Sequence, residues 1–233
     1  MITLESYVLG RWQAGTGKAE ILRDPTSEEP LAQCSSEGIE LGAVVKHGRE
    51  SGGPALRALG FARRAELLLA LSKAIHAHRE ELIELSIRNA GTTRGDAKFD
   101  LDGATGTLAA YAGFGAALGT KPYFADGAPV QLGRTPRFSG QHLWSTKPGL
   151  AVHINAFNIP AWNMAEKMAC ALLAGMPVLE KPGTATALVA WRIAQILVES
   201  KLLPEGAYQL LVGSARDLVD QLGPQDVVAF TGS

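Results

Sequence analysis

The 233-residue sequence contains only two cysteines, and neither belongs to a Cys-x-x-Cys pair. Cys34 and Cys170 therefore provide no disulfide framework, which predicts a reduced, cytoplasmic protein. The five histidines are scattered, and their spacing matches no set of metal ligands, so we expect no metal site. No apolar run approaches the ~20 residues that span a bilayer, and the N-terminus lacks a signal-peptide pattern. We therefore expect no membrane partner.

An excess of charge of one sign is also missing. The formal net charge is −1, and only 19% of the residues are charged. This balance gives no long-range attraction to phosphate backbones, so a nucleic-acid partner is not expected. The 46% of hydrophobic residues excludes an intrinsically disordered chain and supports a sizeable core.

The first part of the chain predicts short strands followed by helices. A strand is expected near residues 6–9, followed by Gly10-Arg-Trp and a turn at 15–17, and a second strand is expected near 21–22. Helices dominate from 36 to 118, where apolar residues recur with a period near 3.6. Alternation from about residue 130 predicts a two-stranded ribbon. We expect three parts: residues 1–129 with the N-terminal strands and helices, an oligomerisation ribbon over 130–148, and a cofactor-binding sheet over 149–233.

The segment 149–233 alternates apolar strands with helices. Strands are expected at 150–154, 177–180, 208–212 and 226–230, and helices at 160–174, 184–200 and 214–222. Thr184 and Ser214 begin two of these helices, where such side chains favour capping. The pattern predicts an α/β fold with an open, parallel, Rossmann-like sheet. A strand that leads into Gly232-Ser233 should continue into a helix, so we expect the N-terminal part of a longer protein.

The carboxyl ends of these strands carry residue types that suit a nucleotide. Open α/β sheets bind ligands at this edge, and the segments 155–160, 181–184, 213–214 and 231–233 supply amides, a lysine, hydroxyls and glycines there. The Gly-x-Gly-x-x-Gly fingerprint is absent. Spacing alone therefore does not decide whether a nucleotide site is present.

An ordered set of motifs resembles the aldehyde dehydrogenase superfamily, from Gly10-Arg-Trp to the last residue. The motifs are Asn155-Ala-Phe-Asn-Ile-Pro160, Glu166-Lys167, Lys181-Pro182 and Phe230-Thr-Gly-Ser233. Residues 91–94, 100–103, 152–158 and 181–186 narrow the resemblance to the CoA-semialdehyde dehydrogenases of aerobic aromatic degradation. Within that group, the chain is similar to the dehydrogenase domain of the bifunctional oxepin-CoA ring-opening enzymes of phenylacetate breakdown. The 3,4-dehydroadipyl-CoA semialdehyde dehydrogenases of benzoate breakdown come second.

The resemblance implies the incomplete cofactor domain of an enzyme that oxidises a CoA-linked semialdehyde to the acid. A cysteine thiolate attacks the aldehyde, hydride passes to the nicotinamide, and a glutamate-activated water releases the product. The family's cysteine and glutamate lie beyond Ser233, so residues 1–233 alone are expected to be inactive. We expect Cys170 to pack as a small hydrophobe. The family also implies a homo-oligomer that is joined through the ribbon.

The resemblance assigns two catalytic residues and a set of cofactor contacts. Asn158 matches the oxyanion-hole asparagine, and Lys167 matches a lysine that supports proton transfer. The implied cofactor-binding residues are Ile154, Asn155, Ala156, Phe157, Lys181, Gly183, Thr184, Gly213, Phe230, Gly232 and Ser233. Thr184 stands where NAD-using members carry a glutamate, so we expect NADP in preference to NAD.

Several alternatives stay open at this point. By residue type alone, Asn158 also fits a turn before proline, and Lys167 also fits a solvated helix position. Glu180 stands in a strand position that the family usually fills with an apolar residue, and the sequence offers no reason for it. The whole chain also fits a general aldehyde dehydrogenase for free aldehydes, or a noncatalytic nucleotide-binding or oligomerising module.

Overall fold

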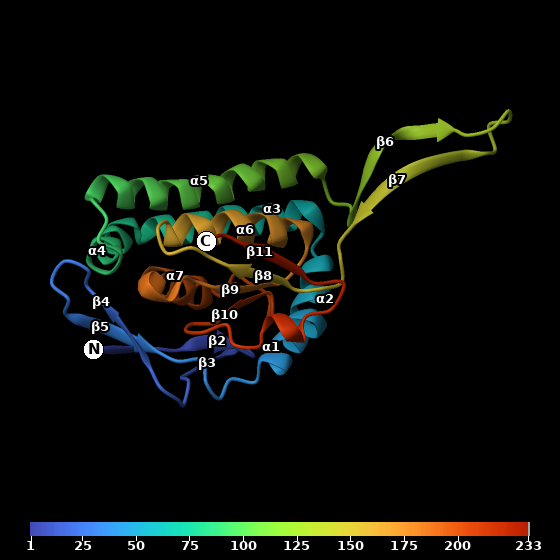
Figure 1. Ribbon diagram of the computed structural model, residues 1–233. Coiled ribbons are helices and arrows are strands. Elements are labelled where there is room, and N and C mark those ends of the chain that lie inside the picture. The colour runs from blue at the N-terminus through green and yellow to red at the C-terminus, as the bar shows by residue number, and fades with distance from the viewer. Residues whose placement is uncertain (233) are drawn as a thin grey trace.

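The computed structural model describes residues 1–232. Its main sheet has six strands in the order β11-β8-β9-β10-β2-β3 (Figure 1). Strands β8 (Ala151–Ile154), β9 (Val178–Lys181), β10 (Tyr208–Leu210) and β11 (Val227–Phe230) are parallel. The expected open parallel sheet is therefore confirmed. A hairpin of β2 (Ser6–Val8) and β3 (Arg11–Gln13) extends it in antiparallel orientation, so the whole sheet is mixed.

The strand order reverses between β8 and β11. From β8 the chain proceeds to β9 and then β10 on one side, and it returns to place β11 on the other side of β8. Ligands of open α/β sheets bind at the carboxyl ends of the strands beside such a reversal. The topology therefore points to the segments that follow Ile154, Lys181 and Phe230.

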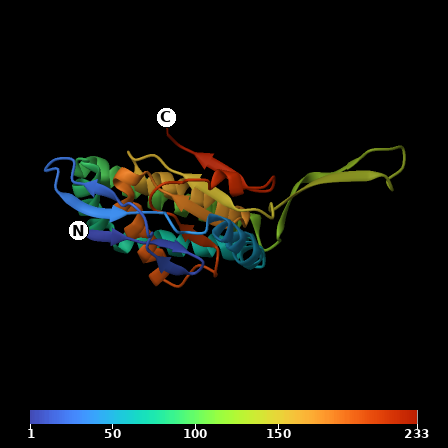
Figure 2. The ribbon, with the colours of Figure 1, turned by 60° about the horizontal axis from the view of Figure 1, so that its bottom comes forward.

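Helices cover both faces of the sheet (Figures 1 and 2). Alternate residues of a strand face opposite sides, and Ala151 packs in one core cluster while Val152 packs in the other. The larger core lies beneath α3 (Gly60–Ala77), α4 (Arg79–Ala90), α5 (Arg94–Leu118), α6 (Pro160–Ala174) and α7 (Ala187–Glu199). The smaller core lies beneath α1 (Leu41–His47), which a π-helical turn η1 (Gly48–Gly52) joins to α2 (Gly53–Arg57).

Two smaller sheets flank this body. The N-terminal one has the order β1-β5-β4, from β1 (Ile2–Leu4), β5 (Pro30–Cys34) and β4 (Glu20–Arg23). The other is an antiparallel ribbon of β6 (Tyr123–Gln131) and β7 (Ser139–Ser145), which projects away from the body in Figures 1 and 2. The ribbon begins earlier than the expected residue 130. Its first strand contains Gly127 and Pro129, which are poor strand formers and hide it from a sequence pattern.

The helix expected at 214–222 is absent from the described residues, which have only a 3₁₀ turn η3 (Val219–Gln221) there. Ser214 Oγ does accept from the backbone N–H of Arg216, at 3.2 Å. Arg216, however, has φ +45°, and its guanidinium binds the carbonyl oxygens of Ser36 and Ile39 at 2.9 and 2.8 Å. A left-handed residue cannot continue a right-handed helix, so the prediction was wrong.

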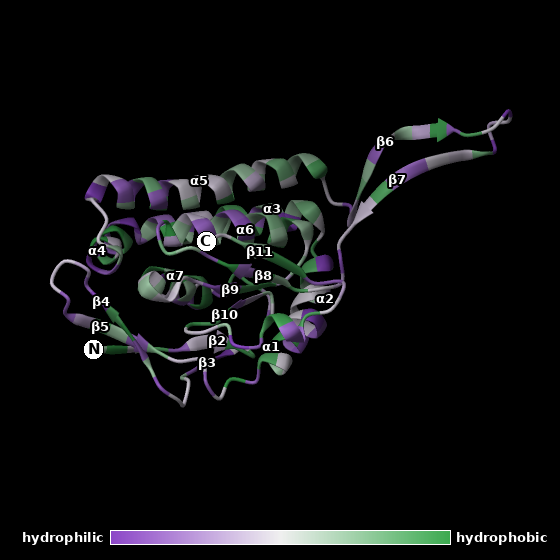
Figure 3. Cartoon of the chain, viewed as in Figure 1, coloured by the Kyte–Doolittle hydropathy of each residue, from purple (hydrophilic) through white to green (hydrophobic). Residues whose placement is uncertain are grey.

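Strand β11 is an exposed, apolar edge of the sheet. It is green in Figure 3, and the exposed fractions of Val228 and Phe230 are 44% and 61%. Across residues 1–232, no helix combines the length and the apolar character that crossing a membrane requires.

Candidate functional site

Two loops meet at the carboxyl ends of β8 and β9. The backbone N–H of Asn155 donates to the carbonyl oxygen of Lys181 at 2.9 Å, and Thr186 Oγ1 donates to the carbonyl oxygen of Phe157 at 2.7 Å. A Cβ atom at position 183 would lie 3.0 Å from the backbone nitrogen of Phe157, so Gly183 permits this close approach. The structure thus brings residues 154–158 next to residues 181–186.

The side chains at this rim differ in exposure. Phe157 is 65% exposed and Asn158 is exposed, whereas Ala156 and Thr184 are half-buried. Lys181 is also half-buried, its Nζ donates to the carbonyl oxygen of Pro182 at 3.0 Å, and burial lowers its pKa. The exposed groups can meet a ligand directly, and Lys181 supplies a cation at their base.

The end of β11 completes the rim. The carbonyl oxygen of Ile154 accepts from the backbone N–H of Thr231 at 2.9 Å, while the Ile154 side chain packs against the smaller core. Phe230 and Gly232 are exposed beside this contact, and Ser233 lies outside the described residues.

Gly213, at the end of β10, has a different environment. It is buried with φ +96°, and a Cβ atom there would lie 3.0 Å from the backbone nitrogen of Ser36. This packing accounts for a glycine at position 213, and its contact with a cofactor stays a prediction.

Asp100 holds the start of α6 from α5, a contact that the sequence did not predict. Its two carboxylate oxygens accept from the backbone N–H groups of Ala161 and Trp162 at 3.1 and 2.7 Å. These donors belong to the first turn of α6, where backbone N–H groups have no helical partner. The carboxylate therefore anchors the turn that directly follows Asn158. Burial raises its pKa to about 6, although both hydrogen bonds act in the opposite direction.

Asn89 of α4 holds the start of α7 in a similar way. Its Nδ2 donates to the carbonyl oxygen of Ala185 at 3.0 Å, and its Oδ1 accepts from the backbone N–H of Leu188 at 3.2 Å. Residues Thr184–Thr186 form a 3₁₀ turn η2, and no side chain caps it or α7 at the expected position. The expected capping role of Thr184 is therefore wrong, since Asn89 serves that end of the helix.

Lys167 points inward from α6. Its side chain is 10% exposed, so the alternative of a solvated helix charge is wrong. Its Nζ donates to Asn155 Oδ1 at 2.8 Å and lies 3.3 Å from Asn163 Oδ1. Burial lowers the pKa of Lys167, although Glu166 and Glu180 act in the opposite direction. The lysine is thus held by amides next to the rim.

Glu180 explains the orientation of Asn155. Its carboxylate is fully buried on β9, directly opposite His153 on β8. One oxygen lies 2.6 Å from His153 Nδ1, and the other accepts from Asn155 Nδ2 at 2.8 Å. His153, Glu180, Asn155 and Lys167 therefore form a continuous buried polar chain, which we call the Glu180 network.

A groove of about 400 Å³ lies between α6 and the edge of the sheet, and its lining includes Tyr111, His153, Lys167, Cys170 and Val227. Cys170 is exposed, so the expected packing of this thiol in the core is wrong, because its face of α6 opens to the groove. Cys34 is buried, which raises the pKa of its thiol to about 11 and keeps it protonated at neutral pH.

Residues 1–232 contain no cluster of three His, Cys, Asp or Glu side chains that could hold a metal ion.

The sequence of this chain is similar to proteins of a known family. A model of the aldehyde dehydrogenase family matches residues 12–233. The chain is 46% identical over 230 residues to the 3,4-dehydroadipyl-CoA semialdehyde dehydrogenase of Aromatoleum evansii, which covers 99% of this chain and 45% of that protein. It is 26% identical to a non-phosphorylating aspartate-semialdehyde dehydrogenase of Halomonas elongata, over 98% of this chain and 45% of that protein.

A solved structure shares the fold. The NADP-dependent glyceraldehyde-3-phosphate dehydrogenase from Bacillus halodurans C-125, complexed with NADP, superposes with a TM-score of 0.84 at 20% sequence identity. The match covers 99% of this chain and 48% of that one. The chain therefore spans about half the length of the curated relatives and of the solved structure that it matches.

Proposed function

The chain belongs to the aldehyde dehydrogenase family, and we propose that it forms the cofactor-binding part of a longer, cytoplasmic, NADP-dependent enzyme. That enzyme oxidises the aldehyde of a CoA-linked semialdehyde to the acid in the degradation of aromatic compounds. The observation that carries the proposal is the 46% identity, over 99% of this chain, to a relative named for such a substrate. The name of that relative favours a dehydroadipyl-type semialdehyde over the substrate of phenylacetate breakdown.

In this proposal, two residues of the rim act on the substrate. Asn158 is exposed directly before the anchored turn of α6, where its amide can donate to the oxyanion that develops on the aldehyde carbon. Lys167, held by Asn155, supports proton transfer when the acid is released. The bound NADP supplies the hydride acceptor, and residues 154–157, Lys181, Gly183 and Thr184 would hold it.

The nucleophile and the general base belong to another part of the enzyme. Cys34 is a buried, protonated thiol, and Cys170 lies within α6, more than two turns from its start. The exposed apolar edge of β11 offers a surface on which further structure can pair. We therefore expect residues 1–233 alone to show no aldehyde oxidation.

The experiment compares the complete reading frame with residues 1–233. Steady-state NADPH formation from a CoA-linked semialdehyde is expected only for the complete enzyme, and a free aldehyde of the same length should react with a lower kcat/KM. Equal kcat/KM values would favour a general aldehyde dehydrogenase. A complete reading frame without activity toward either would favour a noncatalytic module.

The preference for NADP depends on Thr184. Its hydroxyl lies at the rim and caps no helix, and it has no charge to repel a 2′-phosphate. At about 4 Å and an effective dielectric constant near 20, one unit charge contributes about 4 kcal/mol, which is enough to reverse a cofactor preference. We expect Thr184→Glu to favour NAD. The measurement is kcat/KM with each cofactor, and a wild-type preference for NAD would contradict the assignment.

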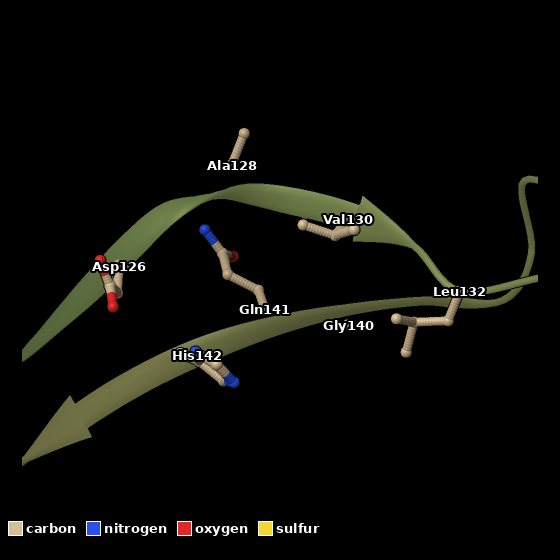
Figure 4. A pocket seen from close by; sticks show the side chains of 7 residues that line it. All are labelled: Asp126, Ala128, Val130, Leu132, Gly140, Gln141 and His142. Carbon is tan, nitrogen blue, oxygen red and sulfur yellow. The ribbon is translucent and has the colours of Figure 1, made fainter.

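The ribbon is the proposed surface for a homo-oligomer. It carries exposed large side chains along its length, namely Tyr123, Phe124, Val130, Leu132, Phe138, Leu143 and Trp144. A groove of about 400 Å³ lies on the ribbon. Figure 4 shows its lining, which includes Ala128, Val130 and Leu132 together with Gln141 and His142. A two-stranded ribbon has two unpaired edges and is marginally stable alone, so pairing with a second copy would stabilise it.

A further inference from the structure

Burying the carboxylate of Glu180 within the sheet costs free energy of folding. The two residues before it on the strand, Val178 and Leu179, are buried and apolar, and its carboxylate has no exposed surface. A buried carboxylate must find donors, and apolar side chains of similar volume often give equal or greater stability at such sites. The two donors that Glu180 has, on His153 and Asn155, satisfy it without making it a source of stability. The residue therefore calls for a role other than stabilising the fold.

A carboxylate oxygen that accepts a hydrogen bond from a neighbouring amide selects one orientation of that amide. Asn155 must turn its Nδ2 toward Glu180, which places its Oδ1 on the opposite side of the amide. Lys167 Nζ lies 2.8 Å from that oxygen, closer than it lies to either oxygen of Asn163. If the amide were reversed, two donors would face each other and the ammonium would lose its shortest contact.

We propose that Glu180 is a positioning residue that acts through Asn155 to hold the Lys167 ammonium in place for the dehydrogenase reaction. This inference rests on the proposed function for the role of Lys167, whereas the geometry of the network is independent of it. His153 completes the network, because its Nδ1 binds Glu180 Oε1 and so leaves Oε2 for Asn155. Glu180 touches neither substrate nor cofactor in this scheme.

Lysine accessibility tests the network without any turnover. The complete protein is treated with formaldehyde and a mild borane reductant, and the dimethylation of Lys167 is quantified by mass spectrometry. Glu180→Gln leaves the amide free to reverse, so Lys167 should react at least about fivefold faster, as expected when a held side chain regains its rotamer freedom. Asn155→Leu removes the link itself and should give the same increase, which provides a second variant if the first does not fold.

Glu166→Gln is the matched control, because Glu166 lies 3.9 Å from the same Nζ but contacts it directly and not through Asn155. Glu166 and Glu180 both raise the pKa of Lys167, so Glu166→Gln measures the purely electrostatic increase in rate, and the increase for Glu180→Gln should exceed it. Equal increases for the two variants would overturn the proposal. Lys181, on β9 beside the network, is the internal reference. An unchanged rate at Lys167 in a folded Glu180→Gln protein would overturn the proposal, and so would an equal increase at Lys167 and Lys181.

Kinetics of the complete enzyme then test the catalytic part in a double-mutant cycle. Loss of a partner that orients a metal ligand costs about 10- to 100-fold in activity, and we expect a similar loss of kcat for Glu180→Gln with KM for NADP unchanged. In a Lys167→Ala background, Glu180→Gln should change kcat less than about twofold, because residues that act in one chain are not additive. Additive losses would refute the positioning role. If the complete enzyme oxidises no aldehyde, the proposed function fails while the methylation result still stands.

Discussion

Replacement of Asp100 by asparagine should change how the stability of the protein depends on pH. The wild-type carboxylate is 2% exposed, and burial raises its pKa from 3.8 to about 6. Between these values the folded state binds more protons than the unfolded state, so the contribution of Asp100 to the free energy of unfolding falls as pH rises. That contribution is fully present below about pH 4 and is lost as pH rises through about 6. A shift of about two units corresponds to about 3 kcal/mol.

Asparagine has nearly the same shape and does not titrate. Ala161 and Trp162 each donate to a different oxygen of Asp100, and asparagine has an oxygen at only one of these two places. The variant therefore loses one buried hydrogen bond, at a cost of about 1–3 kcal/mol that does not depend on pH. The expected signature is therefore a difference in slope. The free energy of unfolding of Asp100→Asn, relative to wild type, should rise by about 3 kcal/mol between pH 4 and pH 7.

Urea unfolding at a series of pH values, followed by tryptophan fluorescence, measures this difference. Asp102→Asn is the matched control, because Arg79 lowers the pKa of Asp102 and its removal should change the slope in the opposite direction. If wild type gains stability relative to Asp100→Asn as pH rises, the two backbone donors outweigh burial and the reasoning about Asp100 is refuted.

Three further predictions concern the rim, the packing beneath it and the ribbon. In the complete enzyme, Asn158→Ala should lower kcat about a hundredfold or more with little change in the Kd of NADP; a lost affinity with intact kcat would contradict the oxyanion role. Gly103→Ala should lower the free energy of unfolding by about 1–3 kcal/mol in thermal melts, because the new Cβ would lie 2.3 Å from the Trp162 ring. Trp144→Ser should shift the complete enzyme toward monomer in light scattering at micromolar concentration, since this side chain is 63% exposed on the ribbon; a wild type that is already monomeric would exclude the ribbon interface.

Elements with strong local signals could be predicted from the sequence. Helix α6 begins at Pro160, where the missing N–H costs little, and ends before Gly175, which has φ +87° and so favours the left-handed end of a helix. The conformation of segment 214–222, in contrast, is not set by its local sequence. Its conformation depends on Arg216 binding carbonyl oxygens of residues 36 and 39, which are far away in sequence, so a local pattern could not show that the helix fails.

The candidate site divides in the same way. Asn158, Lys167 and Lys181 could be selected because motifs surround them, and the structure brings their segments together. The roles of Asp100 and Asn89 could not be predicted, although Asp100 lies in one of these motifs, because the two side chains bind backbone groups about 60 and 100 residues away. Glu180 left a signal in the sequence, because it stands in a strand position that the family usually fills with an apolar residue. The meaning of that signal required the cross-strand register with His153.

Three residues whose roles the sequence did not predict share one physical feature, which connects the fold to the proposed chemistry. Asp100, Asn89 and Glu180 are buried polar groups, and each holds a different part of the rim: the start of α6, the start of α7 and the lysine between them. Apolar packing is not directional, so it could bury these helices equally well without setting where Asn158, Thr184 and Lys167 lie. Hydrogen bonds with both partners buried set direction as well as distance, and a half-satisfied network is costly. Burying these three polar side chains costs stability, and we infer that this cost keeps the rim in one conformation before a ligand binds. A donor that is already in place stabilises developing charge most effectively.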